Sequence, residues 1–256
     1  MADGSLTGLA SLKDAVSTEE WQVRKDLAAL YRLVALNGWD DMIYTHISAR
    51  IPGPEHHFLI NPYGMFFGEM TASALVKVDL DGNVLQETPY FINPAGFTIH
   101  SAIHAARDDA QFVMHLHTDQ GVAVSSQKEG LLPLGQHSLI VLASLAYHDY
   151  EGIALDLDER ERLVADIGDK NTLLLRNHGT LSVGRSAGDC WTHMFYLERA
   201  CLQQVMALAG GRDHVLLATE SVQQVVKQQV SRGIGGALAW PGCLRRLDRE
   251  SPGYDT

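Results

Sequence analysis

The sequence has few cysteines, no long apolar run and no leader-like start, and each absence excludes a class of protein. Its three cysteines, Cys190, Cys201 and Cys243, cannot form the disulfide framework of a small secreted domain, and they suit a reducing compartment. No apolar run approaches the roughly 18 residues that a membrane helix needs. The first residues lack the basic and apolar regions of a signal peptide. We therefore expect a soluble, cytoplasmic protein that does not contact a membrane.

Positive charge is also scarce. The chain has 20 lysine and arginine residues against 31 aspartate and glutamate residues, for a formal net charge of −11. No block of lysine or arginine could follow a phosphate backbone, so a nucleic-acid partner is not expected. Histidine is abundant by contrast, with 12 residues, and the histidines gather between residues 100 and 150, which favours metal chemistry.

Linkers, repeats and low-complexity tracts are absent, which indicates one domain. With 46% hydrophobic residues in a chain of 256, a substantial core can form. We expect a flexible tail over residues 1–18 and a single domain over residues 19–256. The last part of that domain, from about residue 234, is predicted to be an irregular C-terminal arm.

Local signals predict several helices. Ser17 begins a capping box, and the helix that it starts is expected to end before Gly38. Asn93 and Pro94 have the order of an N-cap and a first helical residue, so a second helix is predicted there. The apolar segment over residues 138–146 is predicted to be a third, buried helix.

A predicted strand around His115 and His117 is the strongest site candidate. With the period of two that a strand imposes, Val113, His115 and His117 fall on one face. The two imidazoles are then roughly 6–7 Å apart along the strand, which suits one divalent metal ion. The alternative is a half-buried strand whose histidines only form hydrogen bonds with their neighbours.

A metal site of this kind needs a third ligand, because catalytic metals usually have three protein ligands and an open position. His178 is the best candidate, since it follows a buried strand over residues 172–175 and precedes Gly179, where α/β folds tend to place chemistry. Three neutral imidazoles on a divalent ion leave a strong Lewis acid. Such a centre polarises a carbonyl and stabilises an enolate.

Two other interpretations of the histidines are weaker. His100 and His104, four residues apart on a predicted helix, could bind a metal, but the isoleucines beside them favour packing. The string from His115 to Asp119 also begins the His-x-His-x-Asp-His motif of metallo-β-lactamase-like hydrolases. Gln120 stands where that motif has its next histidine, so the match is poor.

Several motifs, in matching order, resemble the class II aldolase/adducin family from about residue 20 to residue 215. They are residues 92–109 (INPAGFTIHSAIHAARDD), the His115-Leu116-His117 string and residues 175–179 (LRNHG). Residues 71–78 and 145–150 look closer to the adducin head branch than to the sugar-phosphate aldolases. The resemblance implies a three-layer α/β/α fold with a central, mostly antiparallel sheet. It also implies a homotetramer with sites at subunit interfaces, and Zn²⁺ or another divalent ion such as Mn²⁺ or Co²⁺.

The resemblance also assigns site residues. The aldolases of this family hold their metal with the His-x-His pair, a later histidine and a glutamate, which match His115, His117, His178 and position 96. Position 96 is Gly96, so the acid that serves as ligand and general base is missing, and the catalytic acid–base group is unassigned. His46 and His100 are candidate substitutes for the base or ligand, and Tyr254, in the predicted mobile arm, is a candidate proton donor to a leaving group.

The phosphate-cradling serines of the family are missing too. Thr45-His46 stands in place of the Gly-Asn of the first phosphate loop, and Tyr63 replaces the serine of the second. A phosphorylated sugar is therefore not expected, because the donors for its dianion have been replaced. The remaining candidates for substrate binding are Asn61, Gly64 and Asn93.

Two functions are open. The favoured one is a metal-dependent lyase, of aldolase or decarboxylase type, that acts on a small hydroxy- or oxo-acid or aldehyde through a metal-stabilised enolate. Decarboxylation tolerates the loss of the glutamate better, because expulsion of CO₂ needs no initial deprotonation. The alternative is a non-catalytic, adducin-like oligomer that binds cytoskeletal partners. Retention of all three histidines favours the enzyme.

Overall fold

The computed structural model describes residues 11–152, 159–231, 233 and 235–256, without the side chains of residues 94–96. Most of the predicted flexible tail, residues 1–10, lies outside the described residues. Helix α1 (Thr18–Leu36) begins where its capping signal predicted, because the Ser17 hydroxyl accepts a hydrogen bond from the Glu20 backbone N–H at 3.1 Å. The helix ends as predicted, with Gly38 following in a left-handed conformation at a φ of 65°.

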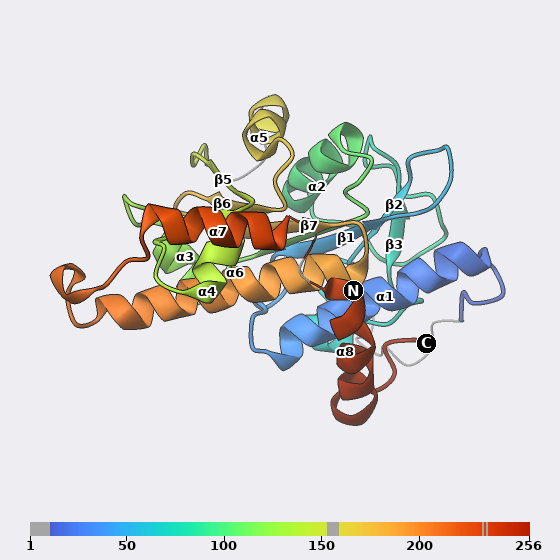
Figure 1. The fold of residues 1–256 in the computed structure, drawn as a ribbon. Helices are drawn as coiled ribbons and strands as arrows, with labels where there is room; N and C mark the ends of the chain where they lie inside the picture. Colours follow the sequence, from blue (N-terminus) through green and yellow to red (C-terminus); the bar gives the residue numbers. More distant parts are fainter. Residues whose placement is uncertain (1–10, 153–158, 232, 234) are drawn as a thin grey trace.

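A seven-stranded sheet forms the centre of the molecule (Figure 1). Its strand order is β3-β2-β1-β4-β7-β6-β5, and every neighbouring pair is antiparallel except β5 and β6. The expected mostly antiparallel sheet is therefore confirmed. The strands are β1 (His46–Arg50), β2 (Phe58–Ile60), β3 (Val76–Val78), β4 (Phe112–Leu116), β5 (Leu145–His148), β6 (Thr172–Leu175) and β7 (Gly179–Gly184).

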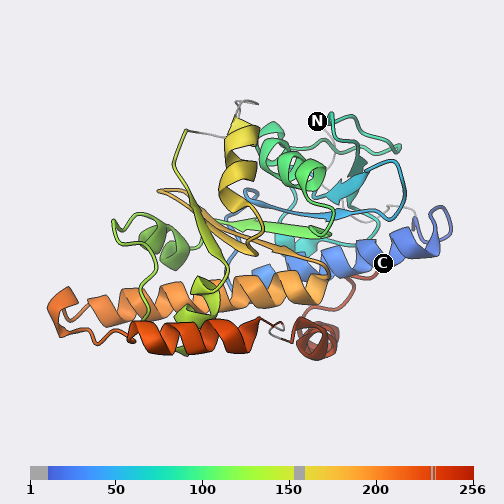
Figure 2. The ribbon, with the colours of Figure 1, turned by 45° about the horizontal axis from the view of Figure 1, so that its top comes forward.

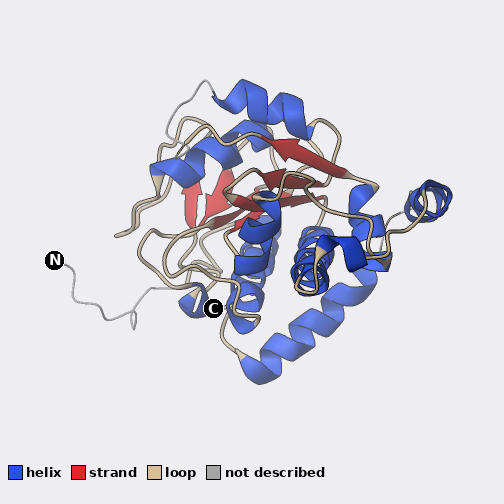
Figure 3. Cartoon of the chain, turned by 90° about the vertical axis from the view of Figure 1, so that its left-hand side faces the viewer, coloured by secondary structure: helices blue, strands red, loops and turns tan. Residues whose placement is uncertain are grey.

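Helices cover both faces of this sheet, as Figures 2 and 3 show. On one face, α1 and α6 (Ala187–Leu208) share a core with Phe112, Met114 and Leu116 of β4. On the other face, α2 (Pro94–Ala106) and α5 (Glu159–Ile167) pack over a second core that contains Val113. The alternation predicted for β4 thus divides its apolar side chains between two cores, and the expected three-layer fold is confirmed.

The remaining helices are shorter or lie at the periphery. They are α3 (Asp119–Ser125), α4 (Gln136–Leu142), α7 (Glu220–Val230), α8 (Gly236–Glu250) and the 3₁₀ turns η1 (Phe67–Glu69) and η2 (Arg212–His214). Within the described ranges, no helix combines the length and the apolar character that crossing a membrane requires.

The helix predicted over residues 138–146 is wrong in its second half. The helical part, α4, ends at Leu142, and Leu145 begins β5, which pairs with β6 in parallel register. An apolar run of this length is compatible with a buried helix or with a buried strand. Residues 145–148 form a strand because β6 provides backbone hydrogen-bonding groups for β5 at the edge of the sheet.

The prediction of an irregular C-terminal arm is also wrong, because residues 236–250 form α8. The Trp240 indole N–H donates to the Asp26 carboxylate at 3.1 Å, and Leu247 is fully buried, so α8 docks on α1 and α6. The segment looked polar because most of its charged residues, Arg245, Asp248, Arg249 and Glu250, are exposed on the helix. Tyr254, proposed as a mobile proton donor, is buried in the α1 core, and its hydroxyl donates to Asp248.

Candidate metal centre

Two strand ends bring the three predicted ligands together. β4 ends at Leu116, immediately before His117, and β7 begins just after His178; the two strands pair with Leu116 opposite Thr180. The candidate ligand atoms of His115, His117 and His178 all lie within 4.8 Å of one another. A single ion can therefore contact all three imidazoles.

The orientation of two of these rings is set by acceptors behind them. The Nδ1–H of His115 donates to the Thr180 carbonyl at 3.0 Å, and that of His117 donates to the Asp41 carboxylate at 3.0 Å. Fixing Nδ1 in this way is how proteins aim the other imidazole nitrogen at a metal. The two Nε2 atoms face each other at 3.0 Å. Their lone pairs repel unless a cation or a proton lies between them.

The electrostatics also suit a metal ion. Burial, together with the neighbouring His178 and His117, holds the pKa of His115 well below its usual range. Burial lowers the pKa of His178 to about 4. These two rings are therefore neutral at physiological pH, and a neutral imidazole is the form that ligates. The donor set fits a borderline divalent ion such as Zn²⁺.

Backbone conformation explains why asparagine and glycine stand on either side of His178 in the Asn-His-Gly motif. Asn177 takes a left-handed φ of 56°, which asparagine tolerates better than most residues. A Cβ on Gly179 would lie 2.3 Å from the Leu116 carbonyl oxygen, so only glycine allows β7 to start this close to the end of β4. The motif thus places His178 beside His115 and His117 by backbone shape as well as by sequence order.

His46 lies next to this cluster and is fully engaged. It stands opposite His115 in the pairing of β1 and β4. Its Nδ1–H donates to Asn61 Oδ1 at 3.0 Å, and its Nε2 accepts from the Asn93 amide at 3.1 Å. Burial lowers its pKa to about 4. His46, Asn61 and Asn93 thus form a hydrogen-bonded frame. His46 is neutral in this frame and has no free nitrogen to act as a base.

The three predicted substrate-binding residues lie in or near this frame. Asn61 is 1% exposed, and its Oδ1 also accepts from the Tyr31 hydroxyl at 2.9 Å, so it supports the frame. Asn93 comes directly before α2 and reaches His46 from the other side. Gly64 follows on the loop after Asn61 with a φ of 98°. Contact with a substrate stays a prediction for all three.

His100 and His104 behave as the packing interpretation predicted. Both are buried, and both contact the Ser48 hydroxyl, at 2.5 Å for His100 Nδ1 and 2.7 Å for His104 Nε2. The His104 Nδ1–H donates to the Ala110 carbonyl at 3.0 Å. Neither residue belongs to the candidate metal-binding cluster of the described residues. Gly96 is outside the residues whose side chains the structure describes.

Two residues of the site were not identified from the sequence. Asp41 orients His117 from 76 positions away. Tyr150, half-exposed at 52%, lies with its ring 5.9 Å from that of His178. No periodicity or motif marked Asp41. Tyr150 ended a segment that resembled the family, but nothing in that segment linked it to His178.

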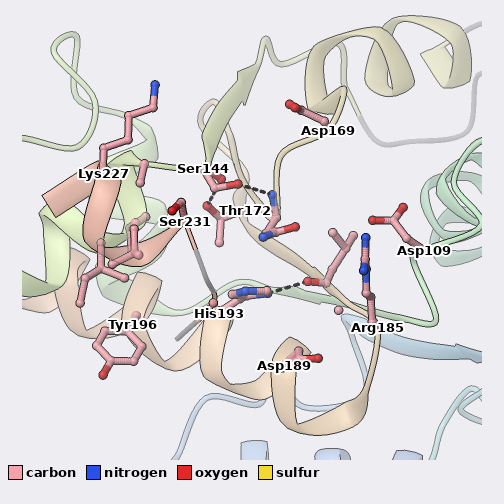
Figure 4. A pocket seen from close by; sticks show the side chains of 18 of the residues that line it. Asp109, Ser144, Asp169, Thr172, Arg185, Asp189, His193, Tyr196, Lys227 and Ser231 are labelled. Atoms are coloured by element: carbon pink, nitrogen blue, oxygen red, sulfur yellow. Dashed lines mark hydrogen bonds between the residues drawn. The ribbon is translucent and has the colours of Figure 1, made fainter. Parts of the chain in front are cut away.

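A separate polar hollow of about 730 Å³ opens near the opposite ends of β6 and β7 (Figure 4). His193 lies in it and donates from Nδ1 to the Val183 carbonyl at 2.8 Å. Arg185 and Lys227 line its two sides in Figure 4. None of the three clustered histidines lines it, so this hollow is not the candidate centre.

Comparisons with known proteins agree with the geometry. The family model described as Class II Aldolase and Adducin N-terminal domain matches residues 25–205. A protein of Caulobacter vibrioides, provisionally named as aldolase class 2, is 75% identical over 99% of both chains. The crystal structure of an aldolase II superfamily protein from Pseudomonas syringae covers 96% of this chain and all of its own, at 51% identity and a TM-score of 0.93. Alpha-adducin of Rattus norvegicus is 43% identical over 226 residues, which are 85% of this chain and 31% of the adducin.

Proposed function

Because the chain belongs to the class II aldolase and adducin family, we propose that it is a divalent-metal-dependent lyase of aldolase or decarboxylase type. The observation that carries the proposal is the convergence of His115, His117 and His178, with two of the rings aimed by acceptors behind them. The proposed ion is Zn²⁺, with Mn²⁺ and Co²⁺ as alternatives. The substrate is a small hydroxy- or oxo-acid or aldehyde. The proposal includes a cytoplasmic homotetramer with sites at subunit interfaces.

The residues of the site divide the work between them. His115, His117 and His178 would hold the ion, while Thr180 and Asp41 keep two of the rings in the ligating tautomer. A divalent ion there would supply Lewis acidity, polarising a substrate carbonyl and stabilising the enolate charge that develops on it. Such a site would promote cleavage of the bond between the α-carbon next to that carbonyl and its leaving carbon, because the electron pair of that bond becomes the enolate.

A proton donor is needed when the cleaved bond leaves a carbanion. Tyr150 is suitably placed, since its ring lies 5.9 Å from that of His178 and half of its surface is exposed. Its hydroxyl would return a proton to the substrate carbon. Decarboxylation remains the favoured reaction, because Gly96 offers no carboxylate to remove a proton at the start.

The frame beside the centre argues against a phosphorylated sugar. His46 occupies a phosphate-loop position of the aldolases, but burial lowers its pKa to about 4 and both of its nitrogens are engaged. It therefore offers a phosphate dianion neither a positive charge nor a free donor. Asn93 and the backbone near Gly64 are better suited to a small neutral or carboxylate group.

Enolate formation gives a direct test. We expect the Zn²⁺-, Mn²⁺- or Co²⁺-loaded protein to release CO₂ from small oxo-acids, as followed by a coupled assay. It should also exchange their α-protons with D₂O, as followed by ¹H NMR, where Tyr150 acts in reverse as the base. His115→Ala should lower either rate by about 100-fold or more, because a ligand is lost. His137→Ala, whose ring lies against Tyr196, is the matched control and should leave the rate unchanged. A pure preparation that takes up none of these metals contradicts the proposal, as does full turnover by His115→Ala.

The similarity to alpha-adducin supports a second candidate, a non-catalytic oligomer that binds protein partners. The chain spans 31% of that adducin's length, and Gly96 removes the family's usual acid. This candidate predicts co-sedimentation with actin filaments and no α-proton exchange or CO₂ release with any metal. Metal-dependent turnover that His115→Ala abolishes would exclude it as the sole function.

A further inference from the structure

Glu198 is a fully buried acid whose position the lyase mechanism does not explain. It lies on α6, on the side of the sheet away from α2 and α5, and its exposed fraction is 0%. In the part of the chain that the structure describes, no lysine or arginine forms an ion pair with it. Burying a carboxylate without a cation is costly, so its hydrogen bonds must stabilise it.

Three side chains donate hydrogen bonds to this carboxylate. The Thr118 hydroxyl and the Gln120 amide both donate to Oε2, the latter at 3.0 Å, and the Thr180 hydroxyl donates to Oε1 at 2.6 Å. Burial raises the pKa of Glu198, and these three bonds oppose the rise. The arrangement suits an anion, because the Thr118 oxygen already accepts the Gly121 N–H at 3.0 Å and its proton is directed at Glu198.

The two threonines are directly connected to the metal ligands. Thr118 follows His117 in the chain. Thr180 is two residues after His178, and its carbonyl accepts the Nδ1–H of His115 at 3.0 Å. One carboxylate therefore joins the end of β4 to the start of β7, the two places from which all three imidazoles project.

Gly121, at the start of α3, leaves the space in which Thr118, Thr180 and Glu198 meet. A Cβ on Gly121 would lie 2.7 Å from Thr118 Oγ1, 2.7 Å from Thr180 Cγ2 and 3.3 Å from Glu198 Oε1. Only glycine lets the first turn of α3 close over the two threonines. The link between Glu198 and the two threonines thus depends on close packing as well as on hydrogen bonds.

We propose that Glu198 is a positioning residue of the metal centre. Its carboxylate holds Thr118 and Thr180 together and so keeps His115, His117 and His178 at ligating separation. It also places a carboxylate behind the three imidazoles, and a nearby negative charge favours a divalent cation in a low-dielectric interior. The inference rests on the metal site of the proposed function, but not on any particular reaction.

Metal affinity is the property that tests the inference. Glu198→Gln keeps the shape of the side chain but removes the charge and turns an acceptor into a donor. We expect its Zn²⁺ affinity, measured by competition with a fluorescent chelator, to fall about 10- to 100-fold, as for other partners behind metal ligands. The visible spectrum of the Co²⁺-loaded protein should change as well, because the ligand geometry relaxes.

Gln204→Ala is the matched control. Gln204 is also a fully buried polar residue of α6, but it accepts from the Leu132 N–H and donates to the Gln127 side chain and the Gly130 carbonyl, none of which belongs to the histidine cluster. We expect it to lower the free energy of unfolding of the metal-free protein and to leave Zn²⁺ affinity within about twofold. A general loss of stability is thereby separated from a loss of ligand geometry.

The outcomes are distinct. Wild-type Zn²⁺ affinity in a folded Glu198→Gln variant overturns the inference and leaves the lyase proposal intact. A wild-type protein that binds no divalent ion overturns both. If Glu198→Gln does not fold, Thr180→Val removes one donor and keeps the carbonyl that orients His115. A drop in its Zn²⁺ affinity supports the inference, and an unchanged affinity overturns it.

Discussion

At the residue scale, the partner of each imidazole decides what a histidine does in this protein. His115 and His117 give Nδ1–H to acceptors and leave Nε2 facing a shared point. His46 and His104 have both nitrogens engaged, so they serve as neutral structural groups. The same side chain is thus a candidate ligand in one place and packing in another, because the tautomer follows from the neighbouring acceptor.

The buried histidines predict a pH dependence of stability. Burial lowers the pKa of His104 to about 3, whereas an unfolded chain protonates histidine near its usual value of about 6.5. Between these values the unfolded state binds the extra proton, so stability falls as the pH drops below about 6.5. We expect His104→Asn to reduce this slope by up to about 1.4 kcal/mol per pH unit in urea denaturation of the metal-free protein. An unchanged slope would show that His104 is not held neutral.

At the element scale, the close pairing of β4 and β7 builds the candidate centre. The strands run antiparallel, so the C-terminal end of β4 and the N-terminal end of β7 lie side by side. His117 and His178 flank this pairing, and Gly179 allows the approach. The centre therefore depends on how two strands meet rather than on one motif.

Gly179→Ala tests this dependence. The new Cβ would lie 2.3 Å from the Leu116 carbonyl oxygen and 3.1 Å from His117 Cδ2, so β7 must shift. We expect a loss of about 2 kcal/mol or more in the free energy of unfolding, together with weaker Zn²⁺ binding. Gly210→Ala is the control, since nothing lies within 4 Å of its Cβ position. Equal Zn²⁺ affinity in both variants would count against the strand-pairing explanation.

At the scale of the whole molecule, the C-terminal segment is part of the packed body. The backbone N–H groups of Ala72 and Ser73 donate to the carbonyls of Tyr254 and Thr256, at 2.8 and 2.9 Å, and α8 lies against α1 and α6. These contacts hold Tyr254 against Asp248, whereas Tyr150 stands beside His178. The arrangement predicts different roles for the two tyrosines.

A pair of conservative substitutions separates these roles. Tyr150→Phe should lower turnover about 10- to 100-fold with little change in Zn²⁺ affinity, because only the proton donor is lost. Tyr254→Phe should retain turnover and lose about 1 kcal/mol of stability, the value of one hydrogen bond. Steady-state rates and urea denaturation measure both. Loss of turnover in Tyr254→Phe alone would reverse the assignment.

Much of the fold follows from local signals in the sequence. The Ser17 cap, the Asn93-Pro94 helix start and the alternation through His115 and His117 act over a few residues, so their outcome was predictable. The place of His178 after a buried strand and before Gly179 marked the third histidine, and the family resemblance added the mostly antiparallel sheet. These features depend on backbone propensity and on periodicity, both of which are written in consecutive residues.

Other features were decided only by contacts between distant segments. β5 needed β6 as a parallel partner, and α8 needed the faces of α1 and α6 to bury its apolar side. Asp41 reaches His117 across 76 positions, and Glu198 reaches Thr118 across 80. The sequence by itself determined which side chains could bind a metal. The tertiary structure decided which acceptors orient them, because a hydrogen bond depends on position in space and not on spacing along the chain.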